Sequence, residues 1–255
     1  SAADVRALKL SDPLKDTGYV MEAHKMLRRE LEHKVPLIGF AGAPFTLASY
    51  AIEGHGTRDY EICKAFMWNQ PEAWGELMEK FADTVSAYLC AQIDAGAQVV
   101  QLFDSWVGYV APRDYERFVL PYTKKVLDTV KAYGDKTVEG GVPVIYFANG
   151  ATSMLDLVQK AGGDILGLDW RLDMKKAVEM IDPRFGIQGN IDPVALFGSE
   201  ESIDEQVREI LEAFGTRPGH IFNLGHGIHK TTDPDKARYF VESVKRQSAI
   251  IRGGN

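Results

Sequence analysis

Short apolar runs recur along the chain, and each is followed by a stretch whose apolar residues have helical spacing. Within the runs nearly every position is apolar, as expected for strands that are buried on both faces of a parallel sheet. We predict six such strands, at residues 37–41, 98–103, 143–147, 165–168, 185–188 and 220–224. Strand and helix therefore alternate without a linker, which predicts an α/β fold in a single domain over residues 1–255.

Capping residues mark the ends of the predicted helices. Apolar residues three and four positions apart predict a long helix over residues 71–93. A later helix is expected to begin at a capping box formed by Ser202 and Glu205. Asp192 is expected to cap another helix with Pro193 in its first position, and this structural task is sufficient to explain Asp192 without a catalytic role.

Polar and glycine residues gather in the loops that follow the strands, such as FDSWVG after the second strand and NLGHGI after the sixth. A doubly wound nucleotide-binding sheet would carry G-x-G-x-x-G after its first strand, and the turn GAPF at 42–45 lacks that spacing. Polar residues at the carboxyl ends of strands are typical of the active site of a TIM barrel. We therefore predict a TIM (β/α)8-type barrel with about six of its eight strand–helix units in this chain. Residues 1–35 are expected to be a lead-in and the helix of a preceding unit.

Composition narrows the class of function. The chain has 255 residues, of which 45% are hydrophobic and 25% charged, as in an ordinary globular protein. Its formal net charge of −7 argues against a nucleic-acid partner. No apolar run is long enough to cross a membrane, and residues 1–16 lack the pattern of a secretory signal. Two cysteines, Cys63 and Cys90, cannot form a disulfide framework, which favours a reducing compartment such as the cytoplasm.

Candidate chemistry lies at the ends of the predicted strands. His226 follows the last strand in a glycine-rich loop, where it would bind a carboxylate or transfer a proton; the alternative is a turn with a satisfied histidine. Asp104 and Ser105 end the second strand, and Asp104 either has a functional role or bonds the backbone amides of its own loop. Tyr50 lies in the second turn of a helix begun by Pro44, where it faces either the cleft or the core.

Two other kinds of site are not expected. Ser105 lies outside any G-x-S-x-G motif and has no base assigned to it, so an acyl-transfer triad is not predicted. Neither cysteine follows a strand, and His226 and His229 alone do not make a zinc site, so no metal is predicted. Three other histidines are expected to be solvated: His24, His33 and His220.

Five stretches of the chain, in order, resemble the uroporphyrinogen decarboxylase family. The resemblance runs from about residue 35 to the C-terminus, and five ordered matches are a specific signal. The matching stretches are GFAGAPFTL (39–47) with Tyr50 and Glu53-Gly54, QLFDS (101–105), GLDW (167–170), QGNIDP (188–193) and NLGHG (223–227).

This resemblance implies a cofactor-free barrel that acts as a homodimer in the cytoplasm, or in the plastid of a photosynthetic eukaryote. The family removes carbon dioxide from the four acetate side chains of uroporphyrinogen and leaves coproporphyrinogen, in haem and chlorophyll biosynthesis. The family's substrate-contacting tyrosine, serine and histidine fall on Tyr50, Ser105 and His226, and its apolar contact falls on Phe40. In this family Tyr50 and His226 would orient the reacting acetate or relay protons.

The chain departs from the family pattern at its front. The family's carboxylate-binding arginines and its pyrrole-binding aspartate have no counterpart in residues 1–16. We therefore expect this chain to be the C-terminal portion of a longer barrel, with impaired activity on its own. Two alternatives stay open: an inactive remnant that binds a porphyrin precursor, and a zinc- and corrinoid-dependent methyltransferase of the same superfamily.

Overall fold

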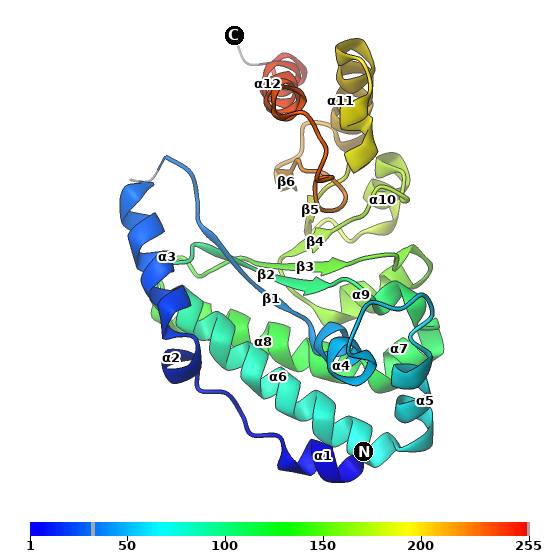
Figure 1. Ribbon diagram of the computed structural model, residues 1–255. Helices are drawn as coiled ribbons and strands as arrows, with labels where there is room; N and C mark the ends of the chain where they lie inside the picture. The colour runs from blue at the N-terminus through cyan, green and yellow to red at the C-terminus, as the bar shows by residue number, and fades with distance from the viewer. Residues whose placement is uncertain (32–33, 254–255) are drawn as a thin grey trace. The chain divides into compact units, whose positions relative to one another are not determined.

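The computed structural model describes residues 1–31 and 34–253, and the chain divides into two compact units, Ser1–Asp164 and Ile165–Asn255 (Figure 1). Each unit contains three of the six strands described. The strand predictions are confirmed in number and in position, except that the last strand is shorter than predicted. The prediction of one barrel domain over residues 1–255 stays a prediction.

The first unit is built on three parallel strands, β1 (Ile38–Gly42), β2 (Val99–Asp104) and β3 (Val144–Ala148), which pair in the order of the chain. The side chains of β3 are buried throughout, as its unbroken apolar run predicts. The helices of this unit are α1 (Ala2–Ala7), α2 (Pro13–Asp16), α3 (Gly18–Glu30), α4 (Pro44–Glu53), α5 (Glu61–Asn69), α6 (Pro71–Asp94), α7 (Pro112–Phe118), α8 (Leu120–Thr137) and α9 (Leu155–Ala161), with short 3-10 turns η1 (Val107–Tyr109) and η2 (Thr152–Met154).

Helix α6 is the long helix that the apolar spacing predicts. It begins at Pro71 and buries one face, which includes Trp74 and Leu89, against the rest of the unit. Figure 1 shows α6 and α8 side by side, and the two helices pack against each other. After α6 the chain turns at Gly96, whose φ of 105° favours glycine.

A side chain of α6 also satisfies the backbone of β1. The amide of Gln92 accepts from the N–H of Phe40 at 2.8 Å and donates to its C=O at 3.0 Å. Gly39 makes this approach feasible, because a Cβ at that position would lie 2.5 Å from Gln92 Oε1. The buried amide therefore takes the place that a neighbouring strand would occupy in a ladder.

The second unit contains β4 (Ile165–Gly167), β5 (Gly186–Gln188) and β6 (His220–Ile221), again parallel and in chain order. Strand β6 is shorter than predicted, although an isolated bridge between Ile191 and Leu224 continues the parallel pairing. The helices are α10 (Met174–Met180), α11 (Glu200–Phe214) and α12 (Pro234–Ile251), with the 3-10 turn η3 (Pro193–Phe197).

Helices α11 and α12 share an apolar core and a polar clasp. The core includes Ile203, Val207 and Phe240. Asp204 of α11 accepts hydrogen bonds from the hydroxyl of Tyr239 at 3.0 Å and from the guanidinium of Arg246 at 2.7 Å, both on α12. These interactions fix the two helices together at the surface of the unit.

The predicted capping box is wrong by three residues. The N-cap of α11 is Ser199, whose Oγ accepts from the N–H of Ser202 at 3.3 Å. The helix therefore starts before Ser202, with Glu200 and Glu201 in its first turn. Their negative charges stabilise the helix through its dipole, whose positive end lies there. Asp192 is an N-cap as predicted, with its carboxylate accepting from the N–H of Val194 at 2.8 Å. In the described part of the chain, no helix combines the length and apolar character needed to cross a membrane.

Candidate active site

Ser105 is held at the carboxyl end of β2 by the backbone and side chain of Asn149. The N–H of Asn149 donates to Asp104 O at 3.2 Å, and its side-chain amide donates to Ser105 O at 2.9 Å. The N–H of Gly108 in turn donates to Asn149 O at 3.0 Å. Because these bonds join the ends of β2 and β3, the backbone around Ser105 has little freedom.

Asp104 is completely buried and is bonded by two hydroxyl groups. Thr46 Oγ1 donates to Oδ1 at 2.9 Å, and Tyr146 donates through its phenol to Oδ2 at 3.2 Å. Desolvation of the carboxyl raises the pKa of Asp104 to about 7, against the lowering effect of these bonds. The carboxyl thus bonds side chains of α4 and β3 in place of the amides of its own loop.

Tyr50 lies on α4 next to the loop that follows Ser105. Its side chain is 47% exposed, so it is not a core tyrosine. Its ring meets the ring of Trp106 edge-on, with centroids 6.0 Å apart, and Trp106 also contacts Tyr60 at 5.5 Å. The structure therefore brings the predicted Tyr50 and Ser105 to the same side of the unit, joined by Trp106.

Phe40 belongs to a row of aromatic rings that crosses the three strands of the first unit. Phe40 is 61% exposed and packs edge-on against Phe103 at 5.7 Å, and Phe103 packs against Phe147 at 5.9 Å. Phe147 is buried, so the apolar surface that this row offers to a flat ligand is that of Phe40 and Phe103. The position of Phe40 at the exposed end of this row agrees with an apolar contact.

In the second unit, His226 lies beside the loop that follows β4. Its ring meets the ring of Trp170 edge-on at 6.2 Å. The guanidinium of Arg171 stacks over the same Trp170 ring at 4.0 Å. Asp169 is buried, accepts from the N–H of Arg171 at 2.8 Å and forms an ion pair with its guanidinium at 3.3 Å. His226 itself is exposed, so it is accessible to a ligand.

The loop of His226 approaches its neighbour at the level of the backbone. A Cβ on Gly225 would lie 2.5 Å from the backbone N of Trp170. Asn190, after β5, braces the loop that follows β4, because its amide donates to Asp169 O at 2.9 Å and to Leu172 O at 2.6 Å. The peptide bond between Gly189 and Asn190 is cis. Three loops at the ends of β4, β5 and β6 are thus in contact.

His220, His24 and the two cysteines have structural surroundings. His220 is not solvated as predicted: its ring stacks on Phe214 at 4.3 Å, and its Nε2 donates to Gly189 O at 2.9 Å. Burial lowers the pKa of His220. His24 is half-buried with Nδ1 at 2.9 Å from Val20 O, and His33 lies outside the described residues. Burial raises the pKa of the thiols of Cys63 and Cys90, to about 12 and about 11.

Sequence reasoning missed two residues of this region, Trp106 and Arg171. Each directly follows a predicted site residue or motif, so adjacency was the available signal, but only the ring contacts show what they touch. Among residues 1–31 and 34–253, no group of three or more His, Cys, Asp or Glu side chains is arranged to hold a metal ion.

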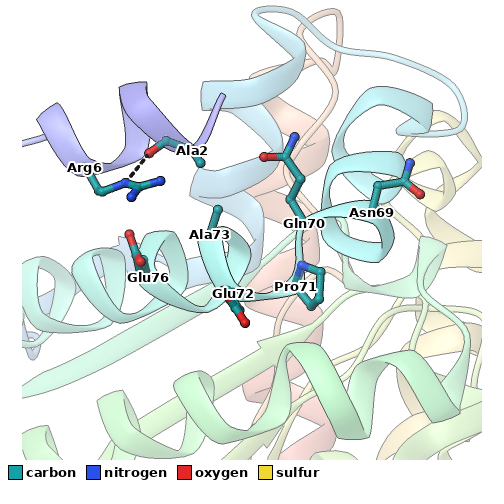
Figure 2. Close-up of a pocket in the computed structure, with 8 residues that line it drawn as sticks. All are labelled: Ala2, Arg6, Asn69, Gln70, Pro71, Glu72, Ala73 and Glu76. Atoms are coloured by element: carbon teal, nitrogen blue, oxygen red, sulfur yellow. Dashed lines mark hydrogen bonds between the residues drawn. The ribbon is translucent and has the colours of Figure 1, made fainter.

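The first unit also has a pocket of about 370 Å³ at the start of α6 (Figure 2). Arg6, Gln70 and Glu76 are among its lining residues, and the guanidinium of Arg6 donates to Ala2 O at 3.2 Å. None of the predicted site residues lines this pocket. A second pocket, of about 300 Å³, includes Phe40 and Tyr88 in its wall.

The family model of uroporphyrinogen decarboxylase matches residues 1–247. The chain belongs to the uroporphyrinogen decarboxylase family. The match also covers residues 1–35, which the five motifs alone did not include. This confirms the predicted family and the predicted class of enzyme, a carboxy-lyase of tetrapyrrole biosynthesis.

Individual relatives agree with the family match. The chain is 56% identical over 247 residues to the uroporphyrinogen decarboxylase of Carboxydothermus hydrogenoformans, which covers 97% of this chain and 69% of the relative. It is 46% identical to the enzyme of Myxococcus xanthus, over 100% of this chain and 71% of that one.

Among solved structures, a B12-independent methionine synthase from Shewanella sp. W3-18-1 in complex with selenomethionine is similar, with a TM-score of 0.63 and 13% identity. The similarity covers 91% of this chain and 66% of that one. At this identity the likeness shows the fold alone. It supports the predicted α/β fold of TIM-barrel type.

Proposed function

We propose that this chain carries substrate-binding and catalytic residues for the conversion of uroporphyrinogen to coproporphyrinogen. The observation that carries the proposal is 56% identity, over 97% of the chain, to a relative named uroporphyrinogen decarboxylase. Tyr50 and His226 are the proposed catalytic residues, and Phe40, Tyr50, Ser105 and His226 the proposed substrate contacts. The names of the relatives favour this reaction over the corrinoid-dependent methyltransferase.

The chemistry requires a place for the electrons that the departing carboxylate leaves behind. Protonation of the adjacent pyrrole carbon turns the ring into an electron acceptor, so the substrate is its own electron sink and no cofactor is needed. The protein then has three tasks: to hold the macrocycle, to stabilise positive charge and to move protons.

The side chains of each unit suit particular tasks among these three. In the first unit, the aromatic row that ends at Phe40 offers an apolar surface, and the phenol of Tyr50 and hydroxyl of Ser105 offer hydrogen bonds to a carboxylate. In the second unit, the exposed imidazole of His226 can bind a carboxylate as imidazolium or hand on a proton.

The same proposal extends to assembly and location. The family resemblance supports a homodimer in the cytoplasm, and the net charge of −7 supports the absence of a nucleic-acid partner. Sedimentation of the purified protein tests the dimer.

Substitution of the proposed catalytic residues tests the reaction. We expect Tyr50→Phe and His226→Ala to lower kcat by about 100-fold each, the usual contribution of a positioned proton donor. Neither side chain belongs to the buried core, so the melting temperature should not change. Chromatography of the porphyrins formed after oxidation counts the acetates lost from uroporphyrinogen.

His229→Ala is the matched control. His229 lies three residues after His226, is exposed, and bonds the hydroxyl of Thr231 at 2.9 Å. Its removal should leave turnover unchanged. Wild-type turnover in both Tyr50→Phe and His226→Ala would remove these residues from the site. Binding of uroporphyrinogen without turnover by the unsubstituted chain would favour the alternative of a binding protein.

A further inference from the structure

A chain of four buried side chains links four elements of the first unit. Thr46 of α4 donates to Asp104 of β2 at 2.9 Å, and Tyr146 of β3 donates to the same carboxyl at 3.2 Å. The phenol of Tyr146 lies 3.1 Å from that of Tyr115 on α7. None of the four residues is more than 4% exposed. Each hydroxyl therefore finds its hydrogen-bond partner inside the protein.

Such a chain is costly to retain for stability alone. A buried carboxyl loses its hydration, and no cation among residues 1–31 and 34–253 offsets that loss at Asp104. Apolar side chains of the same shape would fill this space with less risk of an unsatisfied polar group. The role of Asp104 is therefore sought in its position between neighbouring segments of the unit.

Asp104 connects the two segments that carry Tyr50 and Ser105. It directly precedes Ser105 in the chain, and its partner Thr46 lies four residues before Tyr50 on α4. Residues four apart lie on the same side of a helix, so the bond from Thr46 fixes the helical face that carries Tyr50. From the other side, Tyr146 and Asn149 hold Asp104 against the end of β3.

We propose that Asp104 is a positioning residue that sets the place of Tyr50 relative to Ser105 by tying α4 to the end of β2. This inference rests on the proposed function, in which Tyr50 and Ser105 touch the substrate. Asp104 itself does not act on the substrate. Its task requires hydrogen bonds in the right places and does not require a negative charge.

The difference between bonds and charge gives an informative pair of variants. In Asp104→Asn, Oδ1 still accepts from Thr46, and the new amide donates to Tyr146, whose hydroxyl then donates to Tyr115. The bond from Thr46 is kept, while the bond between residue 104 and Tyr146 and the bond between Tyr146 and Tyr115 both reverse. Asp104→Leu removes every bond at nearly the same volume.

The decisive experiment is a double-mutant cycle of Thr46→Val and Tyr50→Phe, measured as kcat on uroporphyrinogen. Thr46→Val removes the hydroxyl that bonds Asp104 and keeps the backbone bond from Thr46 to the same carboxyl, so it loosens the tie between α4 and β2 without abolishing it. We expect it to lower kcat by about 10-fold in the wild type, since a misplacement of about 1 Å can cost up to 100-fold. In the Tyr50→Phe background the same change should alter kcat by less than about 2-fold, because the group that it positions is absent.

Ser49→Ala is the matched control on the same helix. Ser49 is fully buried, and its hydroxyl bonds only the carbonyls of Phe45 and Thr46 within α4, at 2.8 and 3.0 Å. It should leave kcat within about 2-fold of the wild type, and Asp104→Asn within about 3-fold, since neither breaks the tie to β2. Asp104→Leu should behave as Thr46→Val or worse.

A measurement without turnover separates this inference from the proposed function. The protein is labelled with fluorotyrosine, and Tyr50→Phe identifies the fluorine resonance of Tyr50. Thr46→Val and Asp104→Leu should shift that resonance, whereas Asp104→Asn and Ser49→Ala should not.

Three results would overturn the inference: equal effects of Thr46→Val in both backgrounds, loss of activity in Asp104→Asn, or a Tyr50 resonance that does not respond to Thr46→Val. If Tyr50→Phe is fully active, the proposed function of Tyr50 fails and no group is left for Asp104 to position. A shifted resonance in that case would show that the tie exists without a role in the reaction.

Discussion

Gly225→Ala tests whether the loop of His226 is held by direct backbone contact with its neighbour. The N–H of Gly225 donates to Ile191 O at 2.7 Å, which fixes the glycine in place. A Cβ there would lie 2.5 Å from the backbone N of Trp170 and 3.0 Å from the carbonyl carbon of Asp169. Because both obstacles are backbone atoms, a side chain cannot rotate away, and one of the two loops must move.

The size of the effect follows from that distance. Ordinary contact begins at 3.4 Å, so the loops must separate by about 0.9 Å. Overpacking of this kind costs about 1–3 kcal/mol, and the smaller freedom of alanine in the unfolded chain offsets about 0.4–1 kcal/mol. We expect a net loss of about 1–2 kcal/mol, which lowers the melting temperature by roughly 2–8 °C for a chain of this size.

Gly227→Ala is the control on the other side of His226. A Cβ on Gly227 would have no atom within 4 Å, and its backbone is not in the left-handed region. The same substitution should therefore leave the melting temperature unchanged or raise it slightly. Thermal unfolding followed by circular dichroism compares the two variants, and decarboxylation by Gly225→Ala is expected to fall by up to about 100-fold as His226 moves. A Gly225→Ala protein as stable and as active as the wild type would refute the close approach.

Three further predictions concern stability. Burial lowers the pKa of His220, so the folded protein favours the neutral imidazole, and the free energy of unfolding should fall as the pH falls through the ordinary value of 6.5. In His220→Gln the denaturant midpoint should decrease less over the same pH range, because this titration is absent. Asp204→Ala should destabilise the second unit by about 1–3 kcal/mol, because Arg246 and the hydroxyls of Tyr239 and Ser243 lose their acceptor; Arg246→Ala should cost less in the same denaturant titration. Gln92→Leu should cost about 1–3 kcal/mol by leaving both backbone groups of Phe40 without a partner, and an unchanged unfolding midpoint would contradict that assignment.

The repeating elements could be predicted because burial acts on each segment separately. A strand buried on both faces must be apolar at nearly every position, and β3, which is buried throughout, shows that pattern in full. The long helix α6 follows from apolar spacing in the same way. The start of α11 was placed three residues too late, because Ser199 and Ser202 are both acceptable caps and only the helix geometry distinguishes them.

The candidate site was predicted in part. The motifs that carry the family resemblance contain Phe40, Tyr50, Ser105 and His226, and the family match confirms the resemblance. The roles of those residues stay predictions. Trp106 was missed because its ring contact with Tyr50 joins residues distant in the chain, which leaves no pattern in a single sequence. Arg171 was missed because its position next to Trp170 does not show that its guanidinium stacks on that ring.

The sequence by itself determined the α/β class, the number and order of the strands, and the family. These properties depend on local patterns of apolar and polar residues and on short motifs. Only the tertiary structure decided the partners of Asp104, the stacking of His220 on Phe214 and the approach of Gly225 to Trp170. Each of these joins side chains or backbone from separate elements. The energy of such a contact depends on how the elements pack, which no single segment encodes.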